Sequence, residues 1–126
     1  GRIRKGETLQ LVGGGHFLQQ PILARDLAEL ILSCAGNVNM HGRIFCVAGP
    51  DIIESRTYYD EIARVLGVPP APIEALDVQA HLVEHPDQAP FMCHRIYSLD
   101  KLEASGASVP ATPFVTGIRE HVESLI

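Results

Sequence analysis

Hydrophobic and polar residues near the start of the chain follow the spacing of extended structure. Residues 7–13, "ETLQLVG", alternate weakly between apolar and polar side chains and predict a strand that the glycines at 13–15 end. Residues 16–24, "HFLQQPILA", continue in extended form, because Pro21 would break a helix at that point. The segment therefore predicts two short extended stretches separated by a glycine turn.

The spacing then changes to that of helices separated by another strand. Asp26 is the predicted N-cap of a helix that Gly36 ends, and its core positions are Leu27, Leu30, Ile31 and Cys34. Residues 43–49, "RIFCVAG", form a continuous apolar run that predicts a strand buried on both faces. Ser55 is the predicted cap of a second helix, which ends at Gly67 and has Tyr58, Ile62, Val65 and Leu66 on one face.

The second half of the chain predicts shorter elements. Residues 68–76 are extended, Asp77 begins a short helix that Pro86 ends, and residues 95–99, "RIYSL", are a further short strand. Residues 100–105 predict a helical turn. Thr112-Pro113 is a helix start signal, and the helix that follows places one apolar stripe toward the core: Phe114, Val115, Ile118, Val122 and Leu125. The pattern predicts a mixed α/β fold with short strands and three to five helices.

Length and composition favour a single domain over residues 1–126 with a core of its own. Hydrophobic residues make up 46% and charged residues 20%, with a formal net charge of −5. This acidic balance argues against nucleic acid or an anionic membrane as a partner, and no apolar run approaches the roughly 20 residues of a membrane span. The 3 cysteines cannot all pair within the chain, so we expect a reducing, cytoplasmic setting.

Three local motifs resemble known sites but lack the context that those sites require. The turn "GGGHFL" does not lead into a helix that could hold a dinucleotide pyrophosphate, because Pro21 follows. The sequence "HLVEH" places His81, Glu84 and His85 at the spacing of an inverzincin zinc site, but Pro86 disfavours helical geometry at His85. Tyr97 and Lys101 have the Tyr-x-x-x-Lys spacing of short-chain dehydrogenases without the helix through both residues.

The order of segments resembles the C-terminal portion of the extended short-chain dehydrogenase/reductases, the NAD-dependent epimerase/dehydratase family. "FLQQPILARDLAELIL" is similar to the family's strand-to-helix junction, with Asp26, Leu27 and Ala28 matching its end. "GRIFCVAGPDIIESRTYYDEIARVLG" is similar to the strand and helix that follow in the family. The ending from "YSLDKLEASG" onward resembles the family's last segment at Lys101, Leu102, Gly106, Pro110, Thr112, Gly117 and Glu120.

This resemblance implies a longer parent enzyme that binds NAD or NADP and a small-molecule substrate. It implies an N-terminal Rossmann half that carries the cofactor fingerprint and the catalytic Tyr-x-x-x-Lys helix, so we expect no catalytic, cofactor-binding or metal-binding residue here and no cofactor bound by this portion alone. In nucleotide-sugar members an arginine precedes the junction strand and helps to hold the diphosphate. Here Gln19 occupies that position, which weakens a nucleotide-sugar assignment.

Three polar residues beside extended segments are the predicted substrate contacts: Gln20, His94 and Arg95. The missing Rossmann half is the expected partner, and exposed strand edges predict self-association. Two other classes of function stay open. One is a zinc-dependent hydrolase built on His81, Glu84 and His85, and the other is a non-catalytic domain that dimerises through its apolar faces.

Overall fold

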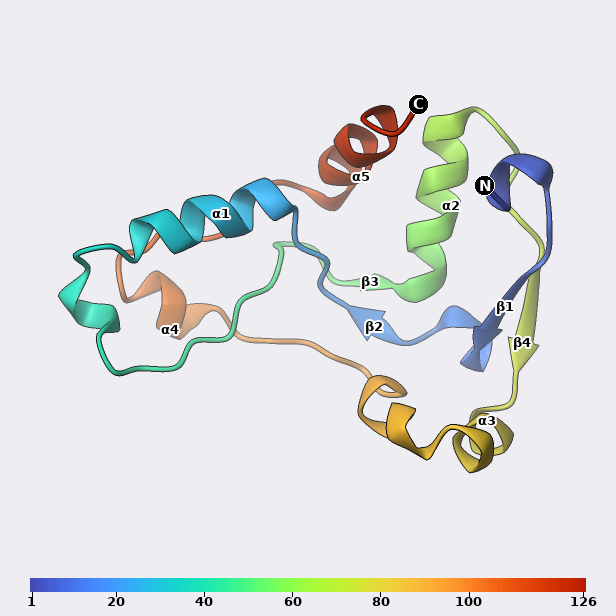
Figure 1. The fold of residues 1–126 in the computed structure, drawn as a ribbon, viewed down its shortest axis with the longest axis horizontal. Helices are drawn as coiled ribbons and strands as arrows, with labels where there is room; N and C mark the ends of the chain where they lie inside the picture. Colours follow the sequence, from blue (N-terminus) through green and yellow to red (C-terminus); the bar gives the residue numbers. More distant parts are fainter.

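The fold was analysed in a computed structural model that describes residues 1–126. It is a mixed α/β fold, as the sequence predicted, with short strands and five α-helices. Strand β1 (Leu9–Val12) pairs in parallel with β4 (Ile73–Leu76), in a register that places Leu9 opposite Ile73. Strand β2 (Leu18–Gln19) pairs antiparallel with β3 (Ile53–Glu54). Figure 1 shows the β1–β4 pair at one end of the molecule and β2–β3 in the middle.

The helices divide between the two ends of the molecule. Helix α1 (Ala24–Ser33) and the short α4 (Asp100–Glu103) lie at one end, and α2 (Ser55–Leu66), α3 (Val78–Glu84) and α5 (Phe114–Glu123) lie toward the other (Figure 1). Short 3-10 helices complete the fold: η1 (Ile3–Lys5), η2 (Gly13–Gly15), η3 (Val38–Met40) and η4 (Pro86–Phe91). None of the helices is long and apolar enough to cross a membrane.

Each end of the molecule has its own hydrophobic cluster. Leu30 of α1, Leu102 of α4 and Ala107 are buried in the first, against Met40, Phe45, Val47 and Val109 among others. Phe114, Ile118 and Val122 of α5 form the second and pack on the face of α2 that carries Tyr58, Ile62, Val65 and Leu66. The predicted core face of α2 is thus confirmed. Because each cluster has only three buried members, each end of the molecule has a small core.

The predicted apolar stripes of α1 and α5 were partly wrong. On α1, Leu30 is buried but Ile31 is 61% exposed. On α5, Val115 is 46% and Leu125 71% exposed. The buried apolar side chains of α5, Phe114, Ile118 and Val122, recur every fourth position, so they occupy one narrow line that packs on α2. The apolar side chains of α5 therefore form a narrower buried stripe than the sequence pattern predicts.

Residues 43–49 and 95–99 are extended but are not strands, contrary to the prediction. Neither segment joins a ladder: no strand pairs with residues 43–49, and the only backbone hydrogen bond from residues 95–99 to β2 runs from the Arg95 N–H to the Leu18 carbonyl. Phe45 and Val47 turn toward the first cluster, while Ile44 is 87% exposed. The continuous apolar run therefore covers the core with one face only, and its other face is open.

The helix caps also differ from the predicted ones. Helix α3 begins at Asp77 as predicted, and the Asp77 side chain caps it by accepting a hydrogen bond of 2.8 Å from the Ala80 N–H. Asp26 does not cap α1, because it lies inside the first turn after Leu23, and the Ser55 hydroxyl donates to the Phe17 carbonyl rather than capping α2. At the start of α5 the Phe114 N–H donates to Asp51 over 2.6 Å. Long-range partners have replaced local caps at these helices.

Candidate functional site

A cavity of about 410 Å³ lies beside η1 and a smaller, more central one of about 300 Å³ lies beside β2. The central cavity is an open pocket lined by β1 and β2, by the start of α2 and by the end of η4, which come from three distant parts of the sequence. We take it as the candidate site because apolar walls there surround a small number of polar groups. Its lining consists of Gln10, Leu11, Val12, Gly15, Phe17, Leu18, Gln19, Ser55, Tyr59, Phe91, Met92, Cys93 and Arg95.

The glycine turn brings α2 against β1 at the back of this cavity. Gly15 has φ of +77°, a conformation that side-chain-bearing residues rarely adopt. A Cβ atom on Gly15 would lie 2.7 Å from a methyl carbon of Leu11 and 3.1 Å from the backbone nitrogen of Arg56. Glycine is therefore required for both the turn and the close approach, so the "GGG" motif serves packing at this point.

The segment that carries Arg95 is held against β2 by three polar contacts. The Arg95 N–H donates to the Leu18 carbonyl over 2.9 Å, and the Leu18 N–H donates to Nδ1 of His94 over 3.0 Å. The Tyr97 N–H donates to the side-chain oxygen of Gln20. These bonds satisfy the exposed edge of β2 without forming a ladder.

The structure thus brings the three predicted substrate contacts, Gln20, His94 and Arg95, to one strand. Their side chains have different surroundings. Gln20 and His94 are bonded to backbone groups, and His94 also packs edge-on against Phe17. Arg95 lines the cavity, where its guanidinium carbon lies 5.5 Å from the ring centroid of Phe91. By this geometry Gln20 and His94 position the segment, and Arg95 presents a charge to the cavity.

Sequence reasoning missed other cavity residues, namely Gln19, Tyr59 and Phe91. The sequence analysis considered Gln19 only as the position where nucleotide-sugar members have an arginine. Tyr59 of α2 was not predicted as a site residue. Phe91 lies at the end of η4, in the stretch between Pro86 and residue 95 for which the sequence predicted no element. No local pattern marks these residues, because only the packing of η4 and α2 around β2 brings them together.

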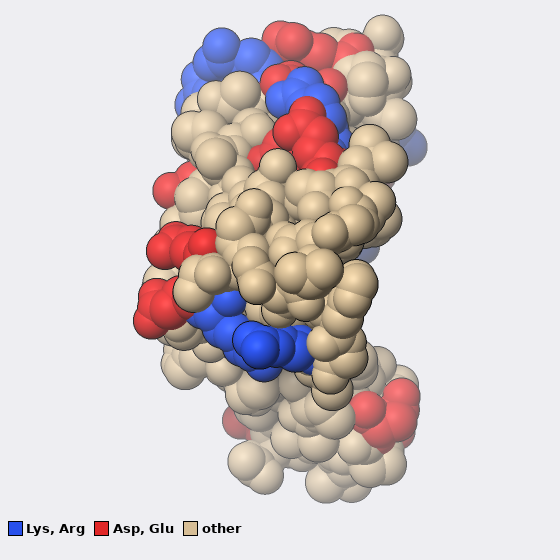
Figure 2. Space-filling view, turned by 90° about the vertical axis from the view of Figure 1, so that its left-hand side faces the viewer, with Lys and Arg blue, Asp and Glu red and all other residues tan.

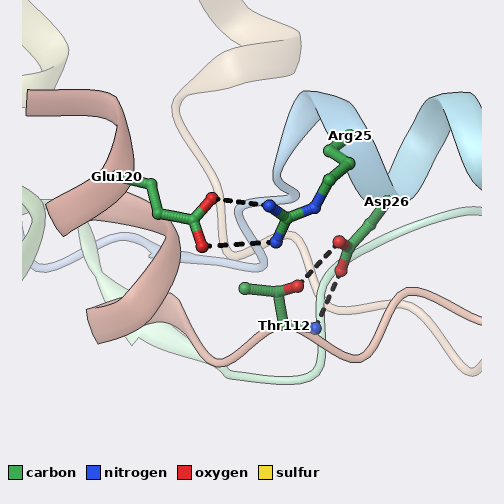
Figure 3. Close-up of polar contacts among 4 residues, drawn as sticks. All are labelled: Arg25, Asp26, Thr112 and Glu120. Carbon is green, nitrogen blue, oxygen red and sulfur yellow. Dashed lines mark hydrogen bonds and ion pairs between the residues drawn. The ribbon is translucent and has the colours of Figure 1, made fainter. Parts of the chain in front are cut away.

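A second polar cluster joins α1 to α5 (Figure 3). The Asp26 carboxylate accepts hydrogen bonds from the N–H groups of Ala111 and Thr112 and from the Thr112 hydroxyl. Beside it, Arg25 forms a two-pronged ion pair with Glu120, at 2.9 and 3.3 Å. Burial raises the pKa of Asp26, but the hydrogen bonds from Thr112 and Ala111 outweigh it, so that the pKa lies below its usual value. Every partner of Asp26 here is structural, which makes this cluster a packing junction.

The histidine motif lies on α3, away from the cavity. The rings of His81 and His85 are 4.7 Å apart, and Nε2 of His81 lies 2.9 Å from Oε1 of Gln88. No group of three or more His, Cys, Asp or Glu side chains is arranged to hold a metal ion anywhere in the chain. The zinc hypothesis therefore has no supporting observation in the fold.

Tyr97 and Lys101 do not share a helix. Tyr97 lies in the extended segment before α4, and Lys101 is inside α4. The Lys101 ammonium donates to the Ile44 carbonyl over 2.7 Å and lies 5.0 Å from the Phe45 ring centroid. Lys101 therefore fixes the extended segment 43–49 to α4, which is a structural role.

The comparisons with known proteins give a likeness of fold. No protein-family model matches the sequence, and no curated protein matches it significantly. Among solved structures, the chain is similar to a dTDP-glucose 4,6-dehydratase from Bacillus anthracis, determined in complex with NAD. The likeness has a TM-score of 0.66 at 17% identity and covers 97% of this chain and 35% of that one. The chain therefore has the fold of one portion of a dehydratase and spans about a third of its length.

Proposed function

We propose that the chain is the C-terminal, substrate-side portion of an NAD(P)-dependent epimerase, dehydratase or reductase. The observation that carries this proposal is the fold likeness to the NAD-bound dehydratase, which extends over 97% of the chain. In the parent enzyme the remaining portion supplies the nucleotide-binding half with the cofactor and the catalytic residues. The present portion supplies one wall of the substrate cleft, the cavity beside β2.

The surface at the α1 end supports a partner of this kind. Ile31 and Leu32 are 61% and 75% exposed on α1, and Ile44 of the extended segment 43–49 is 87% exposed. Figure 2, which views the molecule from that end, shows a broad uncharged area between a charged group above and a basic group below. An unpaired extended segment beside an uncovered apolar helix is an incomplete α/β layer, and a neighbouring parallel strand with its helix would complete it.

The proposal is tested by producing the chain together with the sequence encoded directly upstream. We expect the joined protein to bind NAD(P) in a calorimetric titration, and the chain alone to bind none. Tight binding of NAD(P) by the chain alone would contradict the proposal. So would an upstream sequence that lacks both a glycine-rich βα turn and a Tyr-x-x-x-Lys helix.

Substitutions on α1 test where the two portions meet. Ile31→Asp places a charge on the proposed contact surface, so we expect the upstream portion, supplied as a separate chain, to lose its association with this variant. Val83→Asp is the matched control, because Val83 is an 82% exposed residue of α3 at the other end of the molecule. If both variants associate as the unchanged chain does, the α1 face is not the contact surface.

A further inference from the structure

We infer that the cavity beside β2 binds a compound with one acidic group on a largely apolar body, an aryl or alkyl carboxylate. This inference rests on the proposed function, because it names the substrate class of the same site. It follows from the apolar walls of the cavity, from a single unpaired cation in it, and from the neutral character of its remaining free polar groups.

The walls of the cavity favour an apolar body. The side chains of Phe17, Tyr59 and Phe91 line it from three different parts of the chain, and Leu11, Leu18 and Met92 add to the apolar lining. Burial of apolar surface against such walls is the main favourable contribution to binding in pockets of this size. Aromatic and thioether side chains pack well against a ring.

The charge of the cavity favours a single acidic group on that body. Arg95 is the only charged residue in the lining, and it is half-buried. No carboxylate of the chain pairs with it, and its guanidinium lies over the Phe91 ring. A partly desolvated guanidinium binds a carboxylate with paired, charge-assisted hydrogen bonds.

The remaining free polar groups are neutral. Ser55 donates to the Phe17 carbonyl, and the Gln10 amide donates to Glu74. The side chains of Gln19 and Tyr59 have no hydrogen-bond partner in the fold, so they are available to a hydroxyl or carbonyl group of a ligand. A diphosphate carries more negative charge than one arginine can balance in apolar surroundings.

Binding by the unchanged chain of 126 residues decides between these chemistries. The probes are 3-phenylpropanoate, its uncharged counterpart 3-phenylpropan-1-ol, and dTDP, each followed through the amide NMR signals of Leu18, Tyr59 and Met92. We expect the carboxylate to shift these signals with a Kd about tenfold below that of the alcohol, since a hydrogen bond to a charged group contributes about that much. Equal affinity for the acid and the alcohol, tighter binding of dTDP, or no shift with any probe would each overturn the inference.

Variants assign the preference to Arg95. In Arg95→Met the tenfold preference for the acid is expected to disappear while the alcohol binds as before, and Arg95→Lys is expected to retain part of it. Arg43→Met is the matched control, because Arg43 is exposed and its side chain makes no contact with the cavity. Should Arg95→Met fail to fold, the comparison of probes on the unchanged chain still decides the outcome. If the joined protein does not bind NAD(P), the proposed function is contradicted. If the chain binds the acid and the alcohol with equal affinity, only the proposed substrate class is contradicted.

Discussion

The Asp26 carboxylate of α1 binds Thr112 twice, through the backbone N–H at 2.8 Å and the hydroxyl at 2.7 Å, although the two residues are 86 positions apart. Asp26 is buried, and a buried carboxylate is stable only where hydrogen bonds replace its lost water. This pair therefore fixes the segment before α5 to α1, between the two hydrophobic clusters of the molecule.

Asp26→Asn is expected to destabilise the fold by about 1–3 kcal/mol, since the amide replaces a charged acceptor of three hydrogen bonds and adds two donors without partners. Thr112→Val, which removes only the hydroxyl, is expected to cost about 1 kcal/mol. Urea unfolding followed by circular dichroism measures both. Glu29→Gln is the matched control, because Glu29 is exposed on the same helix and makes no hydrogen bond. An Asp26→Asn variant as stable as Glu29→Gln would contradict the role assigned to this contact.

Stability is expected to fall when the solution is acidified through the range in which Asp26 protonates. The folded-state pKa of Asp26 lies below the ordinary value of 3.8, and that of Glu61 lies below 4.5, mainly because Arg64 hydrogen-bonds its carboxylate. A lowered folded pKa contributes stability above the unfolded pKa, and this contribution is lost as the pH falls through the folded pKa. Unfolding free energies measured from pH 6 down to about 2 should therefore decline below about pH 4, and Asp26→Asn should make the decline shallower. The same slope in both proteins would show that Asp26 is not responsible.

Gly15→Ala is expected to destabilise the chain more than Gly36→Ala. Both glycines have positive φ, +77° and +74°, so each substitution costs about 1 kcal/mol in backbone strain. Only at Gly15 does the new Cβ meet neighbours, since nothing lies within 4 Å at Gly36. Overpacking adds about 1–3 kcal/mol at Gly15. Thermal unfolding of the two variants isolates this added cost, and equal melting temperatures would refute the close approach of α2 to β1.

The sequence could predict the elements that are governed by local rules and not those that depend on neighbours. The core face of α2 and the start of α3 at Asp77 follow from spacing and from short-range hydrogen bonding, and both are confirmed. The predicted strand at residues 43–49 failed because a strand requires a partner, and no part of this chain provides one. Asp26 was assigned to a cap because its true partner, Thr112, is far away in the sequence. Arg95 was selected only as a polar residue beside an extended segment, and its apolar surroundings arise from elements that the sequence could not place together.

Ile31→Lys is expected to reduce self-association of the chain without loss of stability. Ile31 is 61% exposed on α1, so the change replaces an exposed apolar side chain with a charged one and breaks no buried packing. Leu30→Lys is the contrasting variant, because Leu30 is only 3% exposed and lies in the first hydrophobic cluster, where a lysine would unfold that end of the molecule. Light scattering over a range of concentrations, together with urea unfolding, measures both effects. If the unchanged chain is a monomer at every concentration, the exposed face of α1 does not drive association between copies, and only the association test with the upstream portion bears on its role.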